Sequence, residues 1–167
     1  MNKKTNQNSK ILIIAAVLVV AAATVILNIT PKKDAGEVAS NQITKVTDAD
    51  IVIPVDSVTE TPSFYPASIN GVDLEVIAVK ASDGTLRTAF NTCQVCYSSG
   101  KGHYEVDGDQ LICQNCGNRF GMDDLEVTRG GCNPVPITPE YKTVDDKNIT
   151  ITKDFLSKAT VIFQNWK

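Results

Sequence analysis

The first hydrophobic pattern along the chain is an apolar run over residues 11–27 that carries no charged side chain. As a helix with a rise of 1.5 Å per residue it would be about 26 Å long, and extension to residue 29 brings it close to the thickness of a bilayer core. We therefore predict a transmembrane helix over residues 11–29. A cleaved signal peptide is the less favoured alternative, because the run continues past the small residues that a peptidase would cut.

The charges around this run predict its orientation. Lysines 3, 4 and 10 precede it and lysines 32 and 33 follow it, so the positive-inside rule places residues 1–10 in the cytoplasm. Residues 30–47 are polar and lack a sustained period, which is typical of a linker. These features predict a single-pass membrane protein with one extracytoplasmic domain over residues 48–167.

The pattern changes to that of β-strands from about residue 49. Residues 51–55 are short and β-branched, and Pro54 indicates an edge position. Apolar side chains alternate over residues 72–78 and again over 86–90, with a Ser-Asp-Gly turn between them at 82–84. This arrangement predicts a β-hairpin that ends just before Cys93.

A second hairpin is predicted around the turn at residues 106–109. Its second strand, residues 110–112, leads directly into Cys113. Further turn residues at 145–148 precede a short strand at 149–151, and a short helix is expected at about residue 155. We predict a mainly β fold, a small sandwich or barrel-like domain with its cysteine motifs at hairpin tips.

Composition excludes some classes of function. The net charge is −3 and the basic residues are scattered, so the chain lacks the basic stripe that a nucleic-acid-binding protein needs. The sequence carries no phosphate-binding loop and no paired-carboxylate or nucleophile–base signal, so we do not expect an enzyme. No pattern in it predicts an oligomeric state.

Four cysteines form two C-x2-C motifs, Cys93 with Cys96 and Cys113 with Cys116, and 16 residues separate the motifs. The spacing lets both sulfurs of a motif point at one ion, so the two motifs together predict a four-thiolate metal site. Zinc, a single iron or a [2Fe-2S] cluster all suit such a donor set. Disulfides are an alternative in an exported domain, although the total of five cysteines is odd. A thiol–disulfide exchanger would need a βαβ pattern that is missing.

Cys132 is the fifth cysteine and lies in a segment that begins with two glycines and contains Pro134 and Pro136. One interpretation is a residue placed over the metal site, as an additional or exchangeable ligand. The other is a small buried residue, for which cysteine is well suited. His103, the only histidine, lies between the motifs, and we expect it outside the ligand set.

Several ordered motifs resemble those of the FtrD-like family of membrane iron–sulfur proteins. They lie at residues 78–84, 89–97, 100–102, 113–120 and 130–137, and the resemblance extends over about residues 48–165. It implies an iron–sulfur cofactor, electron transfer, and a membrane redox or iron-permease partner. The alternative is a structural zinc-ribbon-type binding domain without redox activity.

The cysteine motifs also show a more distant similarity to Rieske domains, which hold a [2Fe-2S] cluster at hairpin tips under a proline loop. Cysteine stands here where those domains use histidine, and Asn133, Pro134 and Pro136 stand where the covering loop would fall. The similarity implies a [2Fe-2S] cluster with four cysteine ligands. All-cysteine clusters have potentials of about −400 mV in plant-type ferredoxins, so we predict a low potential.

Overall fold

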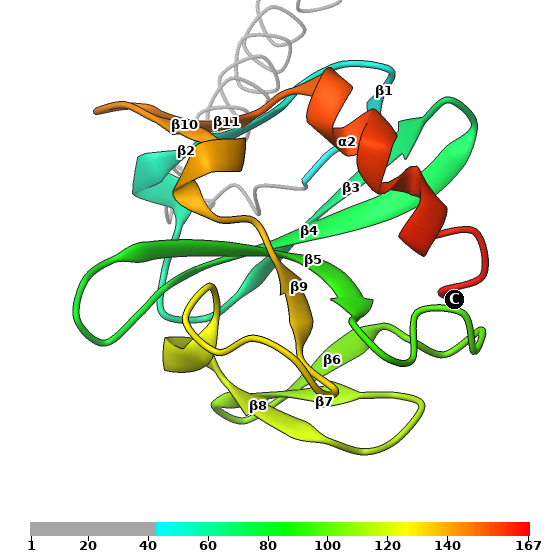
Figure 1. Ribbon diagram of the computed structural model, residues 1–167. Helices are drawn as coiled ribbons and strands as arrows, with labels where there is room; N and C mark the ends of the chain where they lie inside the picture. The colour runs from blue at the N-terminus through cyan, green and yellow to red at the C-terminus, as the bar shows by residue number, and fades with distance from the viewer. Residues whose placement is uncertain (1–42) are drawn as a thin grey trace, which may run out of the picture. The chain divides into compact units, whose positions relative to one another are not determined.

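The computed structural model describes residues 43–167 (Figure 1). The predicted transmembrane helix at 11–29, the predicted cytoplasmic segment at 1–10 and most of the predicted linker lie outside the described residues. Within residues 43–167, no helix is both long enough and apolar enough to cross a bilayer.

A five-stranded sheet forms the middle of the domain, in the order β1-β3-β4-β5-β9. β1 pairs with β3 in parallel, and the other neighbours are antiparallel. The hairpin predicted around residues 82–84 is confirmed as β4 and β5. The strands are β1 (Val46–Thr47), β3 (Ser63–Ile69), β4 (Val72–Lys80), β5 (Leu86–Cys93) and β9 (Pro134–Pro136).

Two three-stranded sheets lie on either side of this middle sheet (Figure 1). One has the order β10-β11-β2, so β2 is an edge strand, as Pro54 indicates. The other has the order β6-β7-β8 and contains the second predicted hairpin. The strands are β2 (Ile51–Pro54), β6 (Tyr104–Asp107), β7 (Gln110–Cys113), β8 (Arg119–Gly121), β10 (Thr143–Val144) and β11 (Asn148–Ile151).

Helical segments are short. The longest is α2 (Lys153–Ala159), which begins where the Thr152 hydroxyl accepts a hydrogen bond from the Phe155 amide. The remaining turns are the 3-10 helices η1 (Val55–Ser57), η2 (Met122–Asp124), η3 (Pro139–Tyr141) and η4 (Thr160–Ile162). The prediction of a mainly β fold is therefore confirmed for the described residues.

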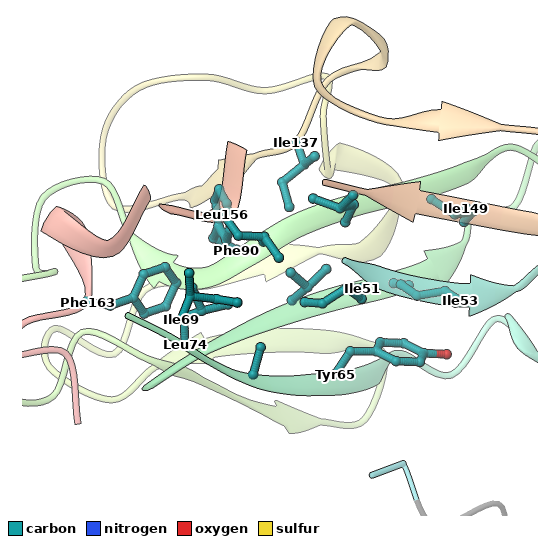
Figure 2. Packing of buried hydrophobic residues seen from close by; sticks show 14 of the residues in the cluster. Ile51, Ile53, Tyr65, Ile69, Leu74, Phe90, Ile137, Ile149, Leu156 and Phe163 are labelled. Atoms are coloured by element: carbon teal, nitrogen blue, oxygen red, sulfur yellow. The ribbon is translucent and has the colours of Figure 1, made fainter. Parts of the chain in front are cut away.

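Two hydrophobic clusters lie on opposite faces of the middle sheet. Leu74, Val76 and Ala78 of β4 belong to the first cluster, whereas Ile77 and Val79 belong to the second. This alternation follows from the period of two in a strand, and it makes β4 apolar on both faces. The first cluster packs the sheet against β2, β11 and α2 (Figure 2). The second packs it against the β6-β7-β8 sheet and includes three cysteines.

Candidate metal centre

The first cysteine motif begins where β5 ends. The pairing of β5 with β9 is irregular between Phe90 and Cys93, and the Cys93 amide donates to the Gly102 carbonyl at 2.7 Å. The chain then turns back on itself, so that a Cβ atom at Gly102 would lie only 2.4 Å from the Cys96 carbonyl oxygen. Glycine is therefore required at residue 102 for the motif to close.

The turn also places backbone N–H groups around sulfur. The Cys96 amide donates to the Cys93 Sγ atom at 3.3 Å. Hydrogen bonds of this kind offset negative charge on a thiolate, which is what a metal-binding motif requires.

The second motif begins where β7 ends. The Gly117 amide donates to the Cys113 carbonyl at 2.8 Å, and Gly117 has a φ of 72°. This positive φ is readily adopted by glycine and lets the chain reverse after Cys116. The Gln114 amide donates to the His103 carbonyl at 2.9 Å, which ties this motif to the segment following the first.

All five cysteines carry free thiols, and all but Cys116 belong to the second cluster or pack against it. Their Sγ atoms form two groups, each with all members within 4.8 Å of one another. One group is Cys93, Cys96 and Cys132, and the other is Cys96, Cys113 and Cys116. Cys96 is common to both groups, and the four thiols of the two motifs do not all lie within 4.8 Å of one another.

The five cysteines differ in their exposure to solvent. Cys93 and Cys113 are buried, Cys96 is 6% exposed and Cys132 is half-buried, whereas Cys116 is exposed. The thiols that follow the strands directly are thus closed off from solvent, and Cys116 marks the open side.

The surroundings shift the thiol pKa values in different directions. Burial raises the pKa of Cys113 to about 12. Burial opposes ionisation of Cys93 as well, but the nearby Tyr104 hydroxyl and the hydrogen bond from the Cys96 amide lower the pKa of Cys93. The Asn118 amide lowers the pKa of Cys116. Thiols this close can all be ionised only beside a cation, because neighbouring thiolates repel one another. The donor chemistry therefore fits thiophilic metals, including zinc, iron and iron–sulfur clusters.

The segment that carries Cys132 is bonded to the first motif. The Gln94 amide donates to the Asn133 carbonyl at 2.9 Å, and the Gln94 side chain bonds both the Gly130 amide and the Pro134 carbonyl at 3.1 Å. Pro134 and Pro136, expected in a covering loop, lie in the short strand β9. Pro134 and Pro136 pair there with Cys93 and Ala89 on β5. Proline is tolerated because β9 is an edge strand of its sheet.

His103 belongs to neither thiol group. Its Nδ1 atom is buried without a hydrogen-bond partner in the described part of the chain, and its ring meets the Trp166 ring edge-on at 6.1 Å.

Two residues outside the cysteine motifs support the site, and Asn91 is the one that the sequence analysis missed. Asn91 is buried on β5 and bonds the backbone of Tyr104 on β6, and the Tyr104 hydroxyl donates to the Cys132 carbonyl at 2.8 Å. The one signal for Asn91 was an amide side chain inside an otherwise apolar strand.

A comparison with known protein families shows which family the chain belongs to. The family described as membrane iron-sulfur containing protein FtrD-like matches residues 57–163, a range that includes all five cysteines. The chain belongs to the FtrD-like family. No curated protein and no solved structure matches it. Family membership and the clustered thiols agree on a metal or iron–sulfur site in this FtrD-like chain. The Rieske-like detail stays a prediction.

Proposed function

We propose that this FtrD-like protein is a membrane-anchored electron-transfer protein whose domain holds a [2Fe-2S] cluster on Cys93, Cys96, Cys113 and Cys116. The observation that carries the proposal is that two cysteine motifs, each directly after a β-strand, bring their thiols together in a member of an iron–sulfur family. When bound, such a cluster accepts and donates one electron.

The spread of the thiols favours two irons over one ion. With Zn–S bonds of about 2.3 Å, the sulfur atoms of a tetrahedral zinc site lie about 3.8 Å apart. The four thiols of the two motifs do not all lie within 4.8 Å of one another, so they are more extended than that. An extended set suits a cofactor with two metal ions, each bound by two thiolates.

The protein's own residues would control access to the centre. Buried side chains of the second cluster, among them Tyr104, Leu111 and Phe120, exclude water from its inner side. Cys116 is exposed, and Val95 is 60% exposed on the first motif. A partner that docks on this open side reaches the ligand shell without any rearrangement of the core.

A membrane redox protein or an iron permease is the partner we propose, with the domain on the extracytoplasmic side. The family description supports the membrane association. A tether at residues 30–47 would keep the domain near such a partner and raise its effective concentration.

Metal analysis of the full chain, purified without oxygen, tests this function. We expect iron with matching sulfide and an EPR signal on reduction, and we expect Cys113→Ser to lose the visible chromophore. A colourless protein with one zinc per chain that also fails reconstitution with iron and sulfide would establish the structural zinc-ribbon alternative, because the same donor set suits zinc.

A further inference from the structure

Cys132 lies against the metal centre as closely as the members of the two motifs do. Its Sγ atom is 4.0 Å from the Cys96 Sγ atom, and it forms a triplet within 4.8 Å with Cys93 and Cys96. Cys96 in turn lies within 4.8 Å of Cys113. Cys93, Cys96, Cys113 and Cys132 are thus a connected set of four thiols that does not include Cys116.

The backbone of Cys132 is held in this place from both sides. Its carbonyl accepts hydrogen bonds from the Tyr104 hydroxyl and from the Asn118 side-chain amide, each at 2.8 Å. The flanking Gly130 and Asn133 are bonded to Gln94 in the first motif. Because these hydrogen bonds hold the segment on both sides of Cys132, its thiol has a fixed position beside the other cysteines.

We infer that Cys132 is an exchangeable ligand that replaces Cys116, so that the centre has two alternative four-thiolate sets sharing Cys93, Cys96 and Cys113. The inference rests on the metal centre proposed above. Cys116 is the ligand that can be released, since it is the exposed member of its motif, whereas the three shared thiols are buried. Exchange swaps one thiolate for another, so the proton that leaves Cys132 is taken up by Cys116 and no electron is transferred.

The first test measures Co²⁺ binding by the reduced full chain, since thiolate-to-Co²⁺ charge-transfer absorption reports how many thiolates bind. The variants are Cys116→Ser, Cys132→Ser and the double variant, with Cys113→Ser as the matched control. We expect either single variant at 116 or 132 to keep a four-thiolate spectrum and to bind within about tenfold of the wild type. The double variant and Cys113→Ser should bind about 100-fold more weakly, because each lacks a fourth thiolate. Equal weakening of Cys116→Ser and the double variant would overturn the inference.

A second measurement does not depend on whether a variant folds. The metal-loaded wild-type chain is alkylated with iodoacetamide, and the labelled thiol is identified by mass spectrometry. Label on Cys116, alone or together with label on Cys132, supports exchange, whereas label on Cys132 alone refutes it. Cys93, Cys96 and Cys113 should stay protected.

The outcomes separate this inference from the proposed function. If iron and sulfide never bind but the Co²⁺ and labelling results hold, the electron-transfer proposal fails and the exchangeable ligand stands. If the wild type carries an iron–sulfur cluster and only Cys132 is labelled, the exchangeable ligand is refuted and the electron-transfer proposal stands.

Discussion

Asn91 makes with its side chain the two hydrogen bonds to Tyr104 that a neighbouring strand would make with its backbone. Its Oδ1 atom accepts from the Tyr104 amide at 2.7 Å, and its Nδ2 atom donates to the Tyr104 carbonyl at 3.3 Å. The same Nδ2 atom donates to Glu75 at 2.6 Å. One buried amide therefore joins the middle sheet to the layer that carries the thiols.

Removal of this amide should loosen the metal-binding layer. Asn91→Ala leaves the buried Tyr104 backbone groups without partners, so we expect a loss of about 2–4 kcal/mol of stability. Chemical denaturation of the metal-free chain measures it. Gln164→Ala, at an exposed position, is the control and should change stability by less than about 0.5 kcal/mol. Equal stability of the two variants would contradict the bridging role.

Gly102→Ala should prevent the first cysteine motif from closing. The added Cβ atom would meet backbone atoms of residues 96 and 97 within 2.8 Å, and backbone cannot swing aside as a side chain can. We expect metal content to fall by at least about half, with a loss of stability of about 1–3 kcal/mol. Gly121→Ala is the matched control, since its nearest contact is the Asp124 carboxylate at 3.2 Å. Full metal content in the residue 102 variant would show that the turn can open.

The ion pair between Lys142 and Glu126 should matter far more than a surface pair. Their side chains are 3% and 13% exposed, and the Glu126 carboxylate also accepts from the Thr88 amide at 2.6 Å. Lys142→Met leaves this charge buried and unpaired, so we expect a loss of about 3–5 kcal/mol. Lys153→Met removes an exposed pair to Asp48 and should lose less than about 1 kcal/mol. Thermal unfolding of both variants compares them, and similar shifts would contradict the difference in burial.

Acid should destabilise the domain partly through Asp123. Hydrogen bonds from the Ser82 amide and hydroxyl lower the pKa of Asp123 below its ordinary value of 3.8. The stabilisation is therefore complete above about pH 4 and is lost as pH falls through the lowered pKa. Melting temperatures between pH 2 and pH 6 should fall less steeply for Asp123→Asn than for the wild type. Equal slopes for Asp123→Asn and the wild type would contradict this role of Asp123.

The reduction potential tests the ligand type. A [2Fe-2S] cluster with four thiolates carries more negative charge than one with two imidazoles, so reduction is harder. We expect a midpoint near −400 mV, the value typical of plant-type ferredoxins, in a redox titration followed by EPR. Cys96→His should raise it, because a neutral ligand replaces an anionic one that both four-thiolate sets share. A wild-type potential above zero would contradict an all-cysteine centre.

The two hairpins could be predicted because they depend on residues close together in the sequence. The turns at 82–84 and 106–109 carry glycines with positive φ, and alternating side chains flank the first of them. A hairpin built on such a turn pairs strands adjacent in sequence, so its register follows from residues close together. Both cysteine motifs could be placed at strand ends for the same reason. The prediction of hairpin tips holds only for the second motif, because β5 and β6 on either side of the first belong to different sheets.

Strand β3 was not predicted, and it contains Pro66. Proline argues against a strand that is paired on both sides, yet β3 lies between β1 and β4. The structure resolves this conflict because β1 pairs only with Ala67 and Ser68. On that side Pro66 has no strand neighbour in the described residues, so its missing N–H leaves no ladder bond unmade.

The hydrogen bonds that hold the segments around the thiols could not be predicted from neighbouring residues in the sequence. Gln94 bonds a segment 36 to 40 residues away, and Tyr104 bonds the Cys132 carbonyl 28 residues away. Spacing between cysteines predicts which thiols can share a metal, but contacts between distant side chains and backbone depend on how the layers stack. The proximity of Cys132 to Cys96 was for that reason one of two open interpretations.

Because the core is divided into two clusters, we expect metal binding to affect protein turnover. Cys93, Cys96 and Cys113 are three of the ten buried residues in the second cluster, whereas the sixteen of the first include no cysteine. Without metal, we expect the second cluster to loosen while the first keeps its packing. Proteases would then find their first cleavage sites in the thiol-bearing layer of empty chains. Degradation would in this way remove the copies that failed to acquire a cofactor.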